Sequence, residues 1–322
     1  MKLRRGWTIL LPAVLLLFAC QAPVAPRSPL SICFLNVGFG DATLIVTPER
    51  HAILVDGGDA GQGANRVGPL LDELHLRGLD HVFVTNYNPE HINGIPEVLA
   101  SLGGEAAIAG HVYDPGGEAA TDEFRRYAAA VGGKRRTLSL GRAVDIDGVR
   151  LECIAVNSRT EPNSTFLPDR PQARLKLRSE DDRSMVLKVT YDDFDLLLGS
   201  DIHGFLTRDF RDLESELAPV VHRVEIYKAN NHASVSSSNR DFVAALNPTV
   251  TVISGADDGR ELTNRHTVRR ILDTGSKVYL TNQIQDVRIP PRRGKAVNGN
   301  IWVRVFDNYY TVNASDTFRF RW

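Results

Sequence analysis

The 322-residue sequence has only three cysteines, a formal net charge of −1, and no hydrophobic run long enough to cross a membrane. No two cysteines form a Cys-x-x-Cys pair, so a cysteine-based zinc site is not expected. The small net charge removes the strongest sequence argument for nucleic-acid binding, a large basic excess, although a local basic groove stays open. The longest apolar stretch, near the N-terminus, falls short of the roughly 20 residues that a bilayer core requires. The sequence therefore predicts neither a disulfide scaffold nor a membrane-spanning helix.

The remaining composition is that of an ordinary globular protein. Hydrophobic residues make up 43% of the chain and charged residues 24%, with 26 glycines and 16 prolines. These proportions exclude a disordered or collagen-like chain. The length permits one large domain or two ordinary ones, and either can bury a sizeable core.

Residues 1–19 differ from the rest of the chain. They begin with basic residues and no acid and continue as an apolar run, which is the plan of a secretory signal. The run ends in Leu17-Phe18-Ala19-Cys20, which resembles the lipobox of bacterial lipoproteins. In that class the signal is removed and the cysteine is diacylated as the new N-terminus. The resemblance implies that Cys20 is a lipidation site and that acyl chains, rather than a spanning helix, hold the protein on a membrane.

The residues after this cysteine indicate where the protein resides. Gln21, rather than an aspartate, follows Cys20, which by analogy with such lipoproteins favours the outer over the inner membrane of a bacterial cell envelope. Residues 20–30 contain three prolines and are predicted to form a semi-extended tether, up to about 30 Å long at ~3.1 Å per residue. The folded domain then comprises residues 31–322 and lies outside the cytoplasm.

Short apolar strands alternate with amphipathic helices along residues 31–322. Each half of this region opens with strands joined by tight turns, such as Asp147-Gly148, and continues with alternating helices and strands. No linker separates the halves, which predicts one layered α/β domain built of two similar halves. The polar stretch 157–184 is predicted to be a long loop insertion. Strands are expected at 32–37, 42–46, 52–55, 81–84, 143–146, 149–155, 185–190, 194–198, 250–253 and 277–280, and helices at 67–74, 95–102, 121–131, 242–246 and 268–272.

The two cysteines outside the signal region, Cys33 and Cys153, both lie in apolar strand-like runs. Free cysteine behaves as a small hydrophobic residue and is often buried, so two buried free thiols are favoured. A disulfide between them stays open as an alternative, because an exported protein folds in an oxidising compartment.

Polar clusters follow four of the apolar strands. Catalytic groups tend to lie on loops held at strand ends, so these clusters are the candidate site. The clusters are Asp56-Gly57-Gly58, residues 85–94, Gly199-Ser200-Asp201 and residues 230–234.

The same clusters carry a resemblance to a known family. Over about residues 31–280 the sequence resembles the metallo-β-lactamase superfamily, in particular the C-terminal domain of the DNA-uptake protein ComEC and its free-standing relatives. The family motif F-L-x-V-G-x-G-D-A matches residues 34–42, and L-I-D-G-G matches residues 54–58. The motif T/S-H-x-H/D-x-D-H-x-G-G falls on residues 85–94, L-L-x-G-D-I on 197–202 with one residue more before the aspartate, and K-x-x-H-H-G-S on 228–234. The resemblance implies a four-layer αββα sandwich of two similar halves.

The sequence departs from this family at the metal positions. The family's first metal takes the leading histidine pair of the H-x-H motif, where this chain has Asn86 and Asn88. Amide oxygens are weak donors for Zn²⁺, so this position is expected to lose its ion. The second position keeps a full candidate set, in which the family's bridging acid is Asp201. The chain is therefore expected to bind at most one ion, Zn²⁺ or else Mn²⁺ or Mg²⁺, and a site without any ion stays open. The candidate ligands are Glu90, His91, Asp201 and His232.

The resemblance also gives supporting positions to other residues. Asp56 corresponds to an acid that orients the metal ligands without binding the metal itself. His266 lies where relatives carry a His-Pro pair, late in the sequence, that contacts substrate. Together with Asp201, these two are the candidate catalytic residues. The amides expected to line the cleft are Asn86, Asn88 and Asn231. The remaining histidines match no motif and are predicted to be structural: His51, His75, His81, His111, His203 and His222.

Two functions from different classes follow. The first is a membrane-anchored, metal-dependent hydrolase, in which the ion polarises an oxygen and lowers the pKa of a bound water. Its substrate, by resemblance, is a phosphodiester, either a small molecule or nucleic acid outside the cell. The second is a catalytically inactive binding or assembly lipoprotein that uses the asparagine-lined cleft. Function depends on the site rather than on the fold, so the two remain open at this point.

Overall fold

The computed structural model describes residues 28–157, 159–160, 179–256 and 263–320. The expected signal peptide at 1–19, the lipidation site Cys20 and most of the tether at 20–30 lie outside these residues. So does most of the expected insertion at 157–184, whose described parts contain a short strand and one helical turn.

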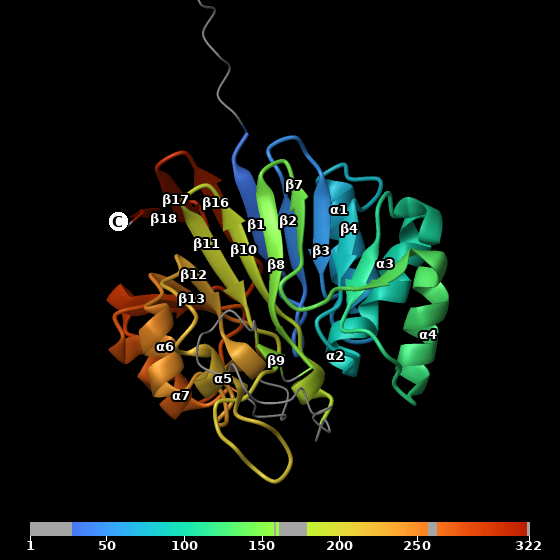
Figure 1. Ribbon diagram of the computed structural model, residues 1–322. Helices are drawn as coiled ribbons and strands as arrows, with labels where there is room; N and C mark the ends of the chain where they lie inside the picture. The colour runs from blue at the N-terminus through green and yellow to red at the C-terminus, as the bar shows by residue number, and fades with distance from the viewer. Residues whose placement is uncertain (1–27, 158, 161–178, 257–262, 321–322) are drawn as a thin grey trace, which may run out of the picture.

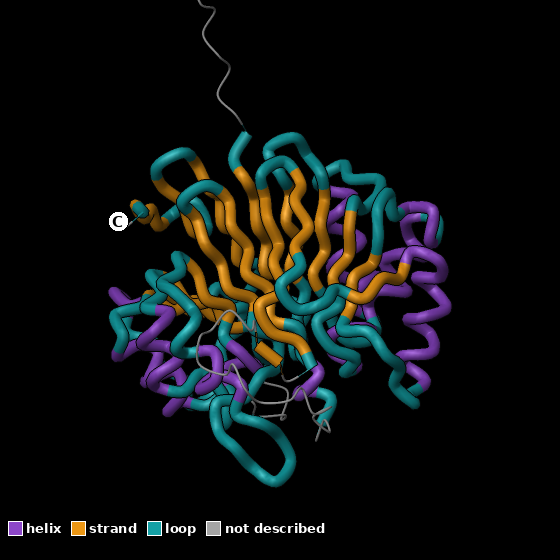
Figure 2. Tube along the Cα trace, viewed as in Figure 1, coloured by secondary structure: helices purple, strands orange, loops and turns teal. Residues whose placement is uncertain are grey.

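Two β-sheets pack face to face between two layers of helices (Figure 1, Figure 2). The first sheet has nine strands, and the second has eight in a row with one short strand beside them. The first sheet contains, in spatial order, β18 (Asp316–Arg319), β17 (Tyr309–Val312), β16 (Ile301–Phe306), β1 (Leu30–Phe34), β2 (Thr43–Val46), β3 (Ala52–Val55), β4 (His81–Phe83), β5 (Val112–Asp114) and β6 (Arg135–Thr137). The second contains β15 (Gly294–Ala296), β14 (Lys277–Leu280), β13 (Val250–Ile253), β12 (Ile226–Lys228), β11 (Phe194–Leu198), β10 (Val186–Tyr191), β8 (Val149–Val156) and β7 (Ala143–Ile146), with β9 (Arg159–Thr160) beside β8.

The helices divide between the two outer faces (Figure 1). The first sheet is covered by α1 (Gly68–Glu73), α2 (Pro89–Ile92), α3 (Gly94–Leu102) and α4 (Asp122–Val131), and the second by α5 (Leu213–Leu217), α6 (Arg240–Leu246) and α7 (Arg265–Asp273). Single helical turns are η1 (Gly63–Val67), η2 (Glu105–Ala107), η3 (Gly132–Lys134), η4 (Asp181–Arg183), η5 (Asn230–Ala233) and η6 (Pro291–Arg293).

Strand β1 illustrates how the sequence builds these layers. Its side chains alternate, because successive residues of a strand point to opposite faces of the sheet. Ile32 and Phe34 lie in the core between the two sheets, whereas Cys33 lies in the core under the first helical layer. A third core, under the second helical layer, includes Leu197 and Phe242. The strand is therefore apolar on both faces, as a central strand of an αββα sandwich must be.

The pairing pattern repeats in the two halves. In the first sheet, β1, β2 and β3 pair antiparallel, and β3 to β6 continue in parallel. In the second sheet, β7, β8, β10 and β11 pair antiparallel, and β11 to β15 continue in parallel. The predicted four-layer αββα sandwich of two similar halves is confirmed. The C-terminal strands β16 to β18 return to the first sheet beside β1, which ties the two ends of the domain together.

Three further observations bear on the predictions. Cys33 and Cys153 are both buried and free, since they belong to different cores. Among the described residues, no helix has the length and apolarity that a membrane crossing requires. The described chain enters β1 at one end of the sheets, and the loops that follow the parallel strands lie at the other end (Figure 1).

Gly94, at the start of α3, provides a test of this packing. A Cβ at this position would lie 1.9 Å from the backbone oxygen of Gly57, which no real contact allows. We expect Gly94→Ala to destabilise the protein by about 3 kcal/mol, because α3 must move away from the loop after β3. Urea denaturation measures the difference.

Gly299→Ala is the matched control, since a Cβ there meets nothing within 4 Å. Its free energy of unfolding should stay within about 0.5 kcal/mol of the wild type. Equal stabilities of the two variants would contradict the packing described for α3.

Candidate functional site

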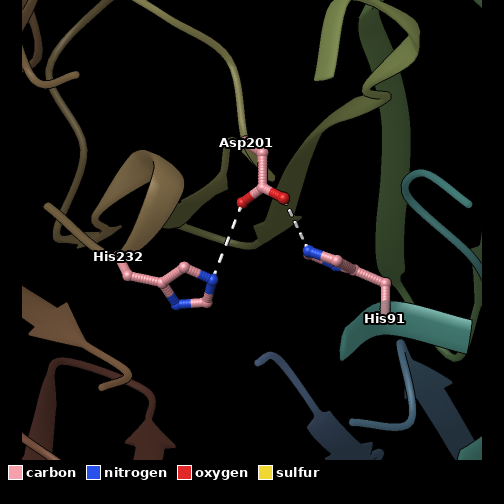
Figure 3. Close-up of side chains that lie close together, drawn as sticks. All are labelled: His91, Asp201 and His232. Carbon is pink, nitrogen blue, oxygen red and sulfur yellow. Dashed lines mark hydrogen bonds and ion pairs between the residues drawn. The ribbon is translucent and has the colours of Figure 1, made fainter. Parts of the chain in front are cut away.

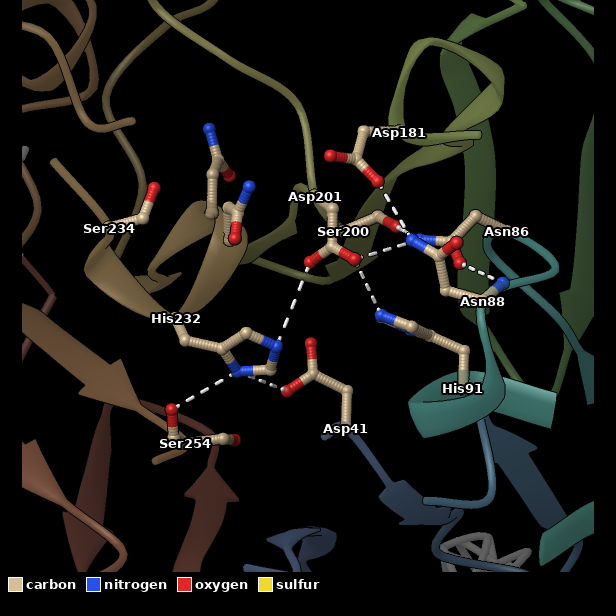
Figure 4. Close-up of polar contacts among 12 residues, drawn as sticks. Asp41, Asn86, Asn88, His91, Asp181, Ser200, Asp201, His232, Ser234 and Ser254 are labelled. Carbon is tan, nitrogen blue, oxygen red and sulfur yellow. Dashed lines mark hydrogen bonds and ion pairs between the residues drawn. The ribbon is translucent and has the colours of Figure 1, made fainter. Parts of the chain in front are cut away.

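Four loops at one end of the sandwich bring the predicted site residues together. Asp56 follows β3, and His91 lies in α2 just after β4. Asp201 follows β11, and His232 lies in η5 just after β12. The first two come from the first sheet and the others from the second, so the site lies where the two halves meet (Figure 4).

His91 lies at the centre of this site and is fully buried. Its Nδ1 is 2.9 Å from Asp56 Oδ2, and its Nε2 is 2.8 Å from Asp201 Oδ2. Burial opposes a charge on the ring, but the two carboxylates outweigh it and hold the pKa of His91 well above its usual value. Without an ion the ring is therefore a cation between two acids.

Asp56 fixes the orientation of this imidazole. One carboxylate oxygen accepts a hydrogen bond from the Thr85 backbone N–H at 2.8 Å, and the other accepts from Thr85 Oγ1 at 2.7 Å. Burial nevertheless raises the pKa of Asp56. A carboxylate that holds the far nitrogen of a histidine in this way aims the near nitrogen into a site, as commonly occurs behind metal ligands.

His232 approaches Asp201 from the opposite side (Figure 3). Its Nδ1 lies 3.2 Å from the carbonyl oxygen of Ser254 and can donate to it, which leaves Nε2 as a free lone pair facing Asp201. Burial lowers the pKa of His232, so the ring is neutral. Its Nε2 lies 3.8 Å from Asp201 Oδ1, which is too long for a hydrogen bond.

These two facing atoms have no hydrogen-bond partner. Asp201 Oδ1 and His232 Nε2 are both buried and unsatisfied among the described residues. Leaving a buried polar group without a partner is costly, and such groups in folded proteins usually indicate a missing ligand or water. His91, Asp201 and His232 each offer one ligand atom, and these three atoms lie within 4.8 Å of one another. Two imidazoles and one carboxylate are a normal set for a zinc ion with one open position, so the residues present fit a metal.

A buried ion pair lies behind His232. Lys228 Nζ is 2.7 Å from Asp41 Oδ1, and that oxygen is 3.8 Å from His232 Nδ1. Burial works against the charge of Asp41, but Lys228 together with His232 and His91 outweighs it and lowers the pKa of the carboxyl. Asp41 also forms a second cluster of potential ligand atoms with Asp56 and His91. Both residues of the pair lie inside the sequence motifs described above, although no role was predicted for either.

Two of the amides expected to line the cleft, Asn86 and Asn88, donate hydrogen bonds to acids of the site. Asn86 is fully buried, and its Nδ2 donates to Asp201 Oδ2 at 3.1 Å and to Ser200 Oγ at 3.0 Å. Asn88 Nδ2 donates to Asp181 Oδ1 at 2.7 Å (Figure 4). Both amides therefore act as hydrogen-bond donors beside the cluster.

Ser200 is the additional residue before Asp201 that the motif comparison found. Its backbone has φ = +55°, an uncommon value for a residue with a side chain. Its hydroxyl lies 2.8 Å from Thr85 Oγ1 and 3.1 Å from Ser184 Oγ. Ser200 therefore forms a turn that places the Asp201 carboxylate between His91 and His232.

The structure does not place Glu90 among the ligand atoms. Glu90 precedes His91 in the single turn α2, and adjacent residues of a helix point in different directions, so only one of them reaches the cluster. The Glu90 side chain instead borders a neighbouring pocket of about 480 Å³, where burial raises its pKa. Of the four expected ligands, the structure thus groups His91, Asp201 and His232.

His266 also lies away from the cluster. It stands in the first turn of α7, whose inner face is formed by Thr267, Val268 and Ile271, so the His266 side chain is exposed. It borders a different pocket, together with Arg269 and other residues of α6 and α7. The expectation that His266 takes part in the site is not supported by this geometry. Asn264, which caps α7, borders the 480 Å³ pocket instead.

His203, predicted to be structural, lies in the wall of the same 480 Å³ pocket as Asp201 and Asn231. Its ring contacts Asp181 and Ser236, and Asn231 Nδ2 lies 3.3 Å from its Nε2. No motif marks His203, and its partners are distant in the sequence. The sequence feature that could have pointed to His203 was its position two residues after Asp201.

The segment that carries His232 has a strained backbone. Asn231, His232 and Ala233 are three consecutive residues with φ of +42°, +52° and +59°. Left-handed conformations cost roughly 1–2 kcal/mol for each residue with a side chain. Hydrogen bonds to the backbone of this turn hold it in place, such as that from Thr263 Oγ1 to the His232 carbonyl at 2.9 Å. Strain that the surroundings impose in this way is typical of functional sites.

Glu214 in α5 anchors the far side of the same segment. Its buried carboxylate accepts hydrogen bonds from Asn230 Nδ2 at 2.7 Å and from the backbone N–H groups of Ser238 and Asn239 at 2.6 Å. Burial, which those donors offset only in part, raises the pKa of Glu214 to about 7. The carboxylate therefore fixes both ends of the loop between residues 230 and 239.

This raised pKa makes stability depend on pH. Because the folded protein holds the Glu214 proton more tightly than the unfolded chain, the free energy of unfolding should fall as the pH rises from about 4.5 to about 7. The fall attributable to Glu214 should be on the order of 3 kcal/mol. Urea denaturation between pH 4.5 and 8 measures it.

Glu214→Gln serves as the comparison, since it removes the titration and keeps the size of the side chain. Its unfolding free energy should be lower than that of the wild type at pH 5 and should change less with pH. Parallel pH profiles for the two proteins would contradict the assignment.

No protein-family model and no curated protein sequence matches this chain. Solved structures do match. The metallo-β-lactamase fold protein YhfI from Bacillus subtilis is 9% identical, with 78% of this chain and 96% of that chain covered and a TM-score of 0.49. A putative metal-dependent hydrolase from Parabacteroides distasonis is 13% identical, with 80% and 94% covered and a TM-score of 0.45.

CmlA, a diiron β-hydroxylase from Streptomyces venezuelae, is 11% identical with a TM-score of 0.51. The match covers 87% of this chain and 55% of CmlA, so the chain spans about half the length of that enzyme. At these identities the likeness concerns the fold alone. The match to CmlA shows a common fold, which in this chain is an αββα sandwich of two similar halves.

Proposed function

We propose that this protein is a hydrolase with a single metal ion, held by His91, Asp201 and His232. The observation that carries the proposal is the pair of buried, unpartnered atoms Asp201 Oδ1 and His232 Nε2, which face each other 3.8 Å apart. A separation of this size suits two ligands of one ion and no direct hydrogen bond. The third ligand atom, His91 Nε2, lies on the other side of the same carboxylate.

The surrounding residues would prepare these three ligands. Asp56 accepts a hydrogen bond from His91 Nδ1, and the Ser254 carbonyl can accept one from His232 Nδ1, so both rings direct Nε2 at the site. Lys228 and Asp41 add a buried charge pair behind His232. A bound Zn²⁺, or Mn²⁺ or Mg²⁺ in its place, would supply a Lewis acid and lower the pKa of a water molecule.

A phosphodiester is the proposed substrate class, and this step rests on the sequence resemblance to the ComEC group. The pocket beside the ligands has a volume of about 480 Å³, within the usual range for small-molecule sites. A small phosphodiester therefore suits it, and a terminal nucleotide of a nucleic acid would also fit.

A catalytically inactive binding protein is the alternative, and the Asn86 amide favours it. This side chain hydrogen-bonds to the same carboxylate that the proposed ion would use. Amide donors and acceptors in a closed cleft are suited to a neutral ligand such as a sugar. The two functions differ in whether the protein contains metal.

Metal content tests the proposal. The purified full chain should contain about one equivalent of a divalent metal by mass spectrometry, and His91→Ala should remove nearly all of it, because the variant loses one of three ligands and the link to Asp56. Hydrolysis of bis(p-nitrophenyl) phosphate should fall at least about 100-fold in the same variant.

His222→Ala is the matched control, since His222 is exposed and lies outside the cluster. It should keep both metal and activity. A wild-type protein without metal, whose thermal stability does not change in chelator, would contradict the hydrolase and leave the binding protein.

We also propose that lipidation of Cys20 attaches the protein to the cell envelope, with the outer membrane favoured. The support is the lipobox-like sequence at residues 17–20 and Gln21 after it. When the full gene is expressed in a Gram-negative host, the protein should fractionate with the outer membrane, and Cys20→Ser should release it from that fraction. An unchanged distribution of the variant would refute the anchor.

A further inference from the structure

A second set of polar side chains lies in the wall of the 480 Å³ pocket, and the proposed metal ligands do not include them. Ser236 Oγ is 2.8 Å from His203 Nδ1, and His203 Nε2 is 2.9 Å from Asp181 Oδ2. A hydroxyl, an imidazole and a carboxylate thus form a continuous hydrogen-bonded row. This row is the arrangement that activates a serine nucleophile.

The imidazole of this row is rigidly held. His203 is buried, and the Phe210 ring stacks on it with centroids 3.6 Å apart and planes 12° apart. The His203 carbonyl accepts hydrogen bonds from the backbone N–H groups of Leu213 and Glu214, both at 3.0 Å. Gly204, the next residue, donates its N–H to the Ser236 carbonyl at 2.8 Å, which ties the two loops together beside the ring.

The hydrogen bonds also define the roles of the two ring nitrogens. Asp181 can only accept, and at 2.9 Å it lies closer to Nε2 than Asn231 Nδ2 does at 3.3 Å, so Nε2 carries the hydrogen. Nδ1 is then left as the acceptor for the Ser236 hydroxyl. The other oxygen of Asp181 accepts from Asn88 Nδ2, which fixes the carboxylate (Figure 4). Serine proteases use the two nitrogens in the opposite order, but the proton transfer depends only on one being donor and the other acceptor.

Neighbouring serines have structural partners, and Ser236 differs from them. Ser237 is buried and donates to the Asn230 carbonyl at 2.7 Å, and Ser238 is buried with its hydroxyl 2.9 Å from Tyr227. Ser234 borders the pocket, and its hydroxyl donates to Ser237 Oγ at 3.3 Å and lies 3.2 Å from Ser236 Oγ. Ser236 is half-buried, borders the pocket and contacts an imidazole.

We propose that Ser236, His203 and Asp181 form a second catalytic centre, which hydrolyses small neutral carboxylic esters without a metal. Ser236 is the nucleophile, His203 the general base, and Asp181 a positioning residue. Without a bound cation, the acids Glu90, Asp181 and Asp201 give the pocket wall a negative charge that disfavours an anionic substrate. A bound metal ion would offset that charge for the phosphodiester proposed above. A neutral ester of modest size fits both the charge and the volume.

The reaction balances within these groups and water. The Ser236 proton moves to His203 Nδ1 as Oγ bonds to the carbonyl carbon and the carbonyl π electrons move to oxygen. When those electrons return, the bond to the alkoxide breaks, and the alkoxide takes the proton from His203. Water then repeats both steps on the acyl-serine and releases the acid. Within the described chain, the backbone N–H groups of Val235 and Ser236 have no hydrogen-bond acceptor, so they are available to the oxyanion.

A fluorophosphonate probe tests this centre, because the activated serine oxygen bonds to phosphorus and displaces fluoride. The full chain should gain one adduct, and peptide mass spectrometry should place it on Ser236. Excess chelator should not slow the labelling, which separates this centre from the proposed metal site. Ser236→Ala should abolish the adduct. Ser101→Ala is the control, since it removes an exposed hydroxyl of α3 outside the pocket, and it should label normally.

Two further variants test the roles of the partners. His203→Gln should slow labelling by at least about 100-fold, the usual contribution of a general base. Asp181→Asn should lower the saturating rate of labelling, and the probe concentration that gives half of that rate should not change. Asp181→Glu should restore part of the saturating rate. Thermal melts confirm that each variant is folded.

Several results would overturn the proposal. These are the absence of an adduct on the folded wild type, an adduct on another residue, or labelling that survives in Ser236→Ala or in folded His203→Gln. In any of these cases the row would only join the loops structurally. If His203→Gln does not fold, Ser236→Ala and Asp181→Asn still decide the matter, because each changes few atoms.

Discussion

The buried imidazole of His91, held between Asp56 and Asp201, is the interaction on which the site depends. Asp56 and His91 belong to loops of the first sheet, and Asp201 belongs to the second, so this contact also joins the two halves. Removing one member of a buried charged group leaves the others uncompensated, which typically costs several kcal/mol. The site and the interface between the halves are therefore the same structure, and a change in one affects the other.

The second half contains two features that cost folding free energy, a left-handed turn and a buried carboxylate. His232 stands in a turn of three left-handed residues, and the buried Glu214 carboxylate holds the loop that follows it. Both acquire a purpose if His232 must present Nε2 to Asp201, and if the loop must also carry Ser236 to the wall of the pocket.

Much of the fold could be predicted from the sequence because local patterns determine it. The apolar residues of β1, whose side chains point alternately to the two faces of the sheet, and the amphipathic pattern of α7 can both be read from the sequence. The motifs likewise located Asp56, His91, Asp201 and His232. The position of Glu90 was not accessible, because it depends on the direction of one side chain in a single helical turn. His203, Asp181 and Ser236 were missed since nothing local connects residues so far apart in sequence, and only the packing of the second half brings them together.

The entry point of the chain has a consequence for how the protein faces its surroundings. The described chain enters β1 at the end of the sheets opposite the loops that carry the site (Figure 1). A lipid on Cys20 would therefore place the sandwich between the bilayer and the pocket. In the anchored protein that we propose, the cleft would open toward the aqueous space and receive solutes from it, and membrane lipids would be poor substrates.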